Sequence, residues 1–184
     1  MKQRNRQAGF TLMELIIGIA IFGILVGIAV TTIGNRSPRA RLKSDARDLI
    51  SNMQLARINA IRDTRPWAIQ FDPNNRRYLV YSNSGEGVGA TPVWDDGDET
   101  IFRTVVLSSG VQFGTQQGVP DAGWATPADG VSFSANRVVF NSNGTSESGA
   151  TYFSINSGET FAISSLSTTG RVKAWFNYGS GWQE

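Results

Sequence analysis

The chain has 184 residues, with 17 Lys and Arg against 15 Asp and Glu, and it contains neither Cys nor His. The length suits one globular domain and one further segment. The absence of Cys and His excludes disulfides, thiolate nucleophiles, His-containing zinc sites and Ser-His-Asp catalysis.

The N-terminal part of the chain combines a basic leader with a long apolar run. Three basic residues lie within residues 1–6, and Leu15 to Val30 carries no charge. Counted from Phe10, the run has 21 residues and one charge, that of Glu14. At 1.5 Å per residue a helix of this length covers about 30 Å, the thickness of a bilayer core. The pattern predicts a transmembrane anchor over residues 10–34, with its N-terminus in the cytoplasm.

Glu14 is the unusual residue of this anchor. A carboxylate at the bilayer centre costs roughly 2.5–3.5 kcal/mol, and less near the interface. Glu14 could lie hydrated at the depth of the headgroups. The segment could also be an ordinary secretory signal, but the carboxylate and the lack of a small-x-small cleavage site disfavour that interpretation. A third interpretation is that the carboxylate is paired, which makes its burial tolerable.

The sequence Gly9-Phe10-Thr11-Leu12-Met13-Glu14 resembles the prepilin-type leader of type IV pilins and type II secretion pseudopilins. The resemblance implies that residues 1–9 are a leader, removed by a prepilin peptidase between Gly9 and Phe10. It further implies that Phe10 becomes the N-methylated first residue, and that Glu14 pairs with the N-terminal amine of a neighbouring subunit. Family helices often carry a Pro near Thr31, and this chain does not.

Removal of the leader would change the charge balance. It would leave 14 Lys and Arg against 15 Asp and Glu, so the basic character of the precursor belongs mainly to the leader. The overall charge therefore does not argue for nucleic-acid binding.

Residues 35–65 are predicted to form an amphipathic helix. Apolar residues recur at spacings of three and four, which makes one buried stripe, while most charges lie off it. The stripe consists of Leu42, Ala46, Leu49, Ile50, Met53, Ala56 and Ala60. Leu55 and Ile58 lie off the stripe, so a second contact face is possible, and Pro66 ends the helical pattern.

Residues 66–184 have the period of two that is typical of strands. Trp67–Phe71 and Tyr78–Tyr81 flank a turn-rich segment and predict a hairpin. Further strands are expected at Ile101–Leu107, Val131–Phe133, Val138–Phe140, Thr151–Ile155, Thr160–Ser164 and Arg171–Phe176. The predicted fold class is α+β and pilin-like: a long N-terminal helix, half transmembrane and half amphipathic, packed on a mostly antiparallel β-sheet domain.

The second half of the chain resembles the GspH/FimT family more weakly. The resemblance rests on Leu55-Ala56-Arg57, an acidic loop at 95–98, Phe140-x-x-x-Gly144 and Gly170-Arg171-Val172-Lys173. It implies a minor pseudopilin of type II secretion or a minor pilin of a type IV pilus: a structural subunit without catalysis or cofactor. The expected partners are other pilins in a filament or its tip, the prepilin peptidase and the inner membrane, with the C-terminal domain in the periplasm.

An acidic loop is a weak candidate for a Ca²⁺ site. Asp95, Asp96, Asp98 and Glu99 place four carboxylates within five positions around a Gly. EF-hand spacing is not met, and a solvated loop is the plainer interpretation.

The last predicted strand is a candidate for DNA binding. Alternation along a strand places Arg171, Lys173 and Trp175 on one face, with two cations beside an aromatic ring. DNA-binding members of the FimT branch carry Gly-Arg-x-Arg here, and Lys173 keeps the charge without the bidentate fork of Arg. The alternative is an ordinary amphipathic strand with its charges in water.

Overall fold

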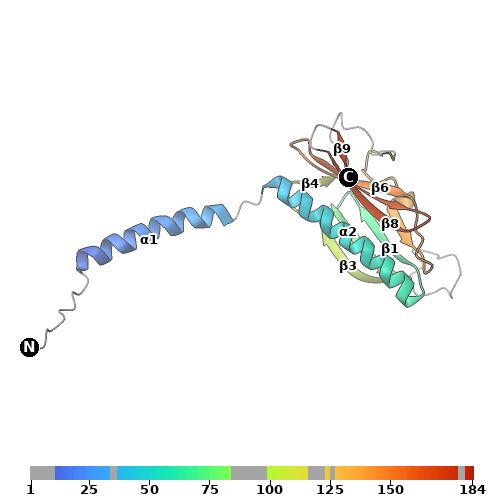
Figure 1. The fold of residues 1–184 in the computed structure, drawn as a ribbon, viewed down its shortest axis with the longest axis horizontal. Helices are drawn as coiled ribbons and strands as arrows, with labels where there is room; N and C mark the ends of the chain where they lie inside the picture. Colours follow the sequence, from blue (N-terminus) through green and yellow to red (C-terminus); the bar gives the residue numbers. More distant parts are fainter. Residues whose placement is uncertain (1–10, 34–36, 84–98, 116–122, 125–126, 178–180) are drawn as a thin grey trace, which may run out of the picture. The chain divides into compact units, whose positions relative to one another are not determined.

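The computed structural model describes residues 11–33, 37–83, 99–115, 123–124, 127–177 and 181–184 (Figure 1). The chain divides into two compact units, Met1–Ser37 and Pro38–Glu184. The first contains helix α1, Leu12–Ile33. Within the described residues, no helix reaches the combination of length and apolarity that a membrane crossing requires. The predicted anchor includes residues 10 and 34, which lie outside the described residues, and it stays a prediction.

The second unit consists of helix α2, Pro38–Asp63, and two antiparallel sheets. The first sheet has the order β3-β2-β1-β5 and the second the order β4-β6-β7-β8-β9. Helix α2 lies along strands of both sheets (Figure 1). The strands are β1 Trp67–Asp72, β2 Arg77–Ser82, β3 Thr100–Val106, β4 Val111–Phe113, β5 Arg137–Phe140, β6 Gly149–Ile155, β7 Thr160–Leu166, β8 Arg171–Asn177 and β9 Trp182–Gln183.

The predicted apolar stripe of α2 forms one wall of the core. Six of its seven residues are buried, and Ile50 is partly buried against the same core. The sheets supply the opposite wall through alternate residues, among them Phe71, Tyr78, Phe153 and Ile163. Residues of the helix at spacings of three and four and alternate residues of the strands therefore pack in one apolar cluster, which confirms the α+β fold class.

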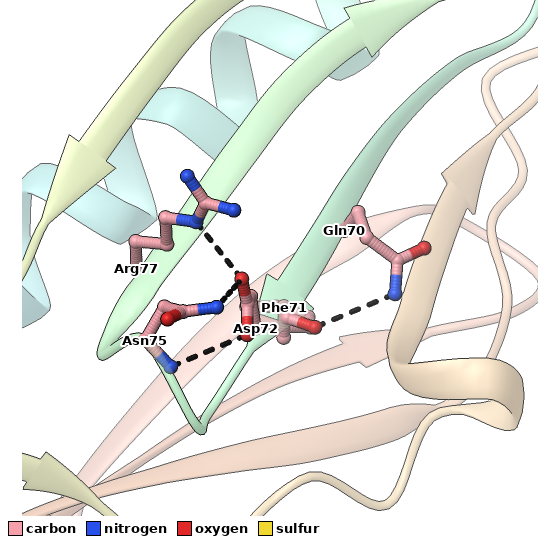
Figure 2. Close-up of polar contacts among 5 residues, drawn as sticks. All are labelled: Gln70, Phe71, Asp72, Asn75 and Arg77. Atoms are coloured by element: carbon pink, nitrogen blue, oxygen red, sulfur yellow. Dashed lines mark hydrogen bonds and ion pairs between the residues drawn. The ribbon is translucent and has the colours of Figure 1, made fainter.

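The predicted hairpin is present as β1 and β2, with register partners Trp67↔Ser82 and Asp72↔Arg77 (Figure 2). Asp72 closes its turn: it accepts hydrogen bonds from Asn75 N at 3.3 Å, Asn75 Nδ2 at 2.7 Å and Arg77 Nε at 2.8 Å. The bonds from Asn75, followed by that from Arg77, lower the pKa of the Asp72 carboxyl. Gln70 Nε2 donates a hydrogen bond to the backbone carbonyl of the next residue, Phe71, at 3.4 Å (Figure 2).

Three details of the sheet domain differ from the sequence prediction. Val131–Phe133 was predicted as a strand, but it contributes only an isolated bridge between Val131 and Thr151. The short strands β4 and β9 were not predicted. The division of the strands between two sheets was likewise not predicted. That division depends on which segments become neighbours in space, and alternation along one segment does not encode it.

Candidate functional site

Helix α1 begins with a side-chain cap. Thr11 Oγ1 accepts a hydrogen bond from Glu14 N at 3.2 Å, and Thr11 O accepts one from Leu15 N at 3.2 Å. Thr-x-x-Glu is the spacing of a capping box, in which Glu at the third helical position also favours the helix dipole. Glu14 is exposed. Gly9 and Phe10, the predicted cleavage site, lie outside the described residues.

Apart from Glu14, the described side chains of α1 are apolar, and they are exposed around the whole helix. Between Leu12 and Leu25 every large apolar side chain is at least about half exposed. These side chains are Leu12, Met13, Leu15, Ile16, Ile17, Ile19, Ile21, Phe22, Ile24 and Leu25. A helix that is apolar on all sides has no stable water-facing surface, so it requires lipid or other helices around it.

Helix α2 carries exposed apolar residues on the face turned away from the core. Ile58 is 61% exposed and Ile61 is 47% exposed. Leu55 is half-buried. These side chains therefore leave apolar surface of α2 exposed, and the use of that surface as a second contact face stays a prediction.

Polar contacts fix α2 on the sheets. Asp45 accepts hydrogen bonds from Ser108 N at 2.8 Å and Ser108 Oγ at 2.7 Å. Asn52 Nδ2 donates to Tyr78 Oη at 2.8 Å, and Arg103 Nη1 donates to Asn52 Oδ1 at 3.3 Å. Burial raises the pKa of the Asp45 carboxyl, against the opposing effect of the Ser108 bonds.

Three of the four motifs that resemble the GspH/FimT family meet through Arg57, Gly144 and Gly170, and the acidic loop at 95–98 lies outside the described residues. Arg57 Nε donates a hydrogen bond to Gly144 O at 3.2 Å. A Cβ on Gly170 would lie 2.4 Å from Gly144 O and 2.9 Å from Arg57 Nε. Gly170 has φ of +58° and Gly144 has φ of +82°. The two turns approach α2 so closely that only glycine fits at Gly170, and Arg57 joins them.

Beside this contact the surface is hollowed. A hollow of about 500 Å³ lies between α2 and the start of β8, lined by Gln54, Arg57, Ile58, Thr169, Gly170, Arg171 and Val172. Among the described residues, no ion pair joins Arg57 or Arg171 to a carboxylate. The sequence did not predict that Gln54 and Thr169 line this hollow. The spacing of Gln54, Arg57, Ile58 and Ile61 by three and four residues was the available signal.

Strand β8 places the predicted basic residues Arg171 and Lys173 on one face, but the two side chains have different neighbours. Arg171, Lys173 and Trp175 pair in register with Leu166, Ser164 and Ala162 of β7, at alternate positions. Arg171 is exposed. Lys173 Nζ lies 2.5 Å from Glu184 Oε1 and 5.6 Å from the centroid of the Trp175 ring.

Trp175 is itself engaged, because its ring centroid lies 5.1 Å from that of Trp124. The hydrogen bond from Lys173 lowers the pKa of Glu184, whose charge opposes that of the lysine. Of the two predicted basic residues, Lys173 forms the ion pair with Glu184, whereas Arg171 forms no ion pair with a described carboxylate but lies close enough for its charge to act on Glu184.

The predicted Ca²⁺ ligands Asp95, Asp96 and Asp98 lie outside the described residues. Glu99 is described and lines a second hollow, on the first sheet. Among the residues that the structure describes, no group of three or more acidic side chains is placed to hold a metal ion.

Comparison with known proteins gives two family matches. The family model of the type II transport protein GspH matches residues 45–171, more than half of the chain. The model of the prokaryotic N-terminal methylation motif matches residues 4–30. The search of curated proteins found no match.

Solved structures resemble the fold. Two structures of the minor pseudopilin EpsH from the type II secretion system of Vibrio cholerae match with TM-scores of 0.51 and 0.52, at 12% and 14% identity. The matches cover 73% and 75% of this chain and 95% of each EpsH chain. The type IV minor pilin FimU of Pseudomonas aeruginosa matches with a TM-score of 0.49 at 16% identity, over 79% of this chain and 95% of that chain.

Proposed function

We propose that this chain, which belongs to the GspH family of type II transport proteins, is a minor pseudopilin that assembles through its N-terminal helix into the pseudopilus of a type II secretion system. Its role is structural, and it needs neither a cofactor nor catalysis. The observation that carries the proposal is α1, whose apolar side chains are exposed on every side. The same architecture serves a type IV pilus, which is the alternative machine.

The proposed life cycle begins in the inner membrane. Residues 10–34 anchor the precursor there, with the basic leader in the cytoplasm and the β-rich domain in the periplasm. A prepilin peptidase cuts between Gly9 and Phe10, and Phe10 is N-methylated; the match to the methylation motif over residues 4–30 supports this step. In the filament the helices of neighbouring subunits replace lipid around α1, so its apolar side chains remain out of water.

Glu14 has two separable roles in this proposal. As the third residue of the helix it donates its backbone N–H to Thr11 Oγ1, and its side chain stands at the position that a capping box reserves for Glu or Gln. As a carboxylate in an apolar bundle it pairs with the N-terminal amine of a neighbouring subunit, because an unpaired charge there is costly. Glutamine serves a capping box as well as glutamate does, but it has no charge to pair.

The variant Glu14→Gln tests the pairing role. We expect it to be inserted and cut at Gly9 as efficiently as the wild type, and to enter filaments at least about tenfold less in cells that supply the other subunits. Thr11→Ala is the matched control, because it removes the cap and keeps the charge. Normal filament entry by Glu14→Gln, measured by immunoblot of sheared filaments, would contradict the pairing role.

A second candidate function is DNA binding by β8, as in a FimT-like minor pilin. The shared face of Arg171, Lys173 and Trp175 supports it, whereas Glu184 beside Lys173 weakens it. If DNA is bound, a salt-dependent gel shift is expected, lost in Arg171→Ala/Lys173→Ala and strengthened in Glu184→Gln, which frees the lysine. Absence of a shift at low salt excludes this function.

A further inference from the structure

Strand β3 is an edge of the first sheet that no described strand covers. In the sheet order it stands at the end, and its free side pairs with no described strand. At seven residues it is longer than β5 at the opposite end of that sheet, and longer than β4 and β9 at the ends of the other. An unpaired edge presents a row of free backbone N–H and C=O groups, to which another extended chain can pair.

The side chains of β3 are unusually apolar for such an edge. Of the five large apolar side chains in the second unit that stand exposed within the described residues, three belong to β3. They are Ile101 at 60%, Phe102 at 52% and Val106 at 66% exposed. Edge strands are commonly protected by charged side chains, Pro or bulges. Strand β3 has no Pro, a single charged residue, Arg103, and one irregularity of register opposite Val80 and Tyr81.

The register shows which residues an added strand would meet. The pairing of β3 with β2 is continuous over residues 103–106. The register shifts once, between Val80 and Tyr81 of β2. Residues opposite each other in a sheet share a face. Ile101, Thr104 and Val106 pair with Tyr81, Leu79 and Arg77, so they belong to the outer face of the sheet.

A hollow adjoins the outer face. Its volume is about 260 Å³, and its lining combines Ile101 of β3 with Gln70, Leu79, Tyr81 and Glu99. A strand added to β3 would place alternate side chains beside this hollow, the arrangement in which main-chain bonds give affinity and pockets give specificity.

Arg103 faces the other side of the sheet. It pairs with the core residue Val80 and donates to Asn52 of α2. Among the described residues no carboxylate forms an ion pair with Arg103. An acidic side chain opposite Arg103 on an added strand would supply that pair.

We propose that the free edge of β3 binds an extended segment of a partner protein, with apolar side chains at alternate positions and an acidic residue opposite Arg103, as an added antiparallel strand. A second copy of β3 fits less well. The antiparallel register that pairs both strands over residues 100–106 places the two Arg103 side chains directly opposite each other. This surface is separate from α1 and from the exposed face of α2, so the proposal does not depend on the proposed assembly role.

The test uses the full chain in detergent micelles and a synthetic acetylated and amidated peptide, Val-Thr-Val-Glu-Val-Thr-Val. Hydrogen exchange of backbone amides is measured with and without millimolar peptide. We expect the amides of β3 to exchange at least about tenfold more slowly with the peptide, and those of β8 to be unaffected. The same peptide with Lys in place of Glu should give no slowing, because it opposes Arg103.

Two lysine variants locate the site. Ile101→Lys/Val106→Lys should abolish the slowing, whereas Ile58→Lys, an equally exposed apolar residue on α2, should leave it unchanged. Unchanged exchange of β1 amides establishes that each variant is folded. No slowing in the wild type, or equal slowing by the Lys peptide, overturns the proposal. Self-association of the chain that Val106→Lys removes assigns the edge to a second copy, and overturns it as well.

Discussion

At the residue scale, Gly170 shows how the family motifs act on structure. Its φ of +58° lies in the left-handed region, and the space of a Cβ is occupied by Gly144 O and Arg57 Nε. The sequence identified Gly144, Gly170 and Arg57 as parts of motifs, but not as neighbours. Their convergence depends on the packing of α2 against two turns far apart in the chain, which no local pattern contains.

We expect Gly170→Ala to lower the unfolding free energy of a fragment of residues 38–184 by about 2–4 kcal/mol. The backbone at Gly144 must shift to make room for the new Cβ, and alanine must adopt a left-handed conformation that it disfavours. Gly158→Ala is the control, since Gly158 has φ of +95° and no atom within 4 Å of a Cβ. It should lose only about 1 kcal/mol. Equal losses in urea denaturation would mean that the contact with Gly144 and Arg57 is not the cause.

Asp45 is a residue whose environment the sequence prediction missed. Most charges of this helix are expected to lie off the apolar stripe, yet Asp45 is buried and accepts two hydrogen bonds from Ser108. Its pKa is raised, so the folded state binds the proton more firmly than the unfolded chain. The contribution of Asp45 to stability is therefore full at low pH and declines as pH rises above the ordinary value for Asp.

Asp45→Asn tests that sign. Asparagine can accept from Ser108 N and donate to Ser108 Oγ, so it imitates the protonated acid. We expect the variant to match the wild type near pH 3 and to become the more stable of the two by pH 7, in urea unfolding followed by tryptophan fluorescence. If the unfolding free energy of the wild type instead rises relative to that of the variant as pH rises, folding favours the charged carboxylate.

At the element scale, periodicity predicted most elements and missed the short ones. The stripe on α2 and the hairpin of β1 and β2 extend over enough residues for a clear period. Strands β4 and β9 have three and two residues, too few for alternation to register. Val131–Phe133 alternates like a strand, but among the described residues only Val131 forms a bridge there, because the chain turns into the short helix Ser134–Asn136.

The exposed face of α2 is expected to contact neighbouring subunits. Ile58→Lys/Ile61→Lys should change the unfolding free energy of the fragment 38–184 by less than about 0.5 kcal/mol, because both side chains are surface residues. The same change should reduce filament entry severalfold in cells. Ser51→Lys, also exposed on α2, is the control and should assemble normally. Normal filament entry by the double variant would show that the exposed face of α2 does not contact neighbouring subunits.

At the scale of the whole molecule, the chain divides into two compact units, Met1–Ser37 and Pro38–Glu184. The second unit has its own core and polar contacts, whereas the described part of α1 leaves its apolar side chains uncovered. Composition and motif predict separate leader, anchor and β-rich parts, because these parts differ sharply in residue type, and the bounds of those parts stay predictions. The pairing of strands into two sheets was beyond the sequence, since alternation tells which residues face the core and not which strands are neighbours.

The central claim is that residues 1–9 are removed and that the chain beginning at Phe10 is the assembling subunit. Mass spectrometry of the protein extracted from membranes of a cell with an active prepilin peptidase tests it most directly. The expected N-terminal peptide begins at Phe10 and carries one methyl group on its amine. A peptide that retains Met1–Gly9 in such a cell would contradict the account.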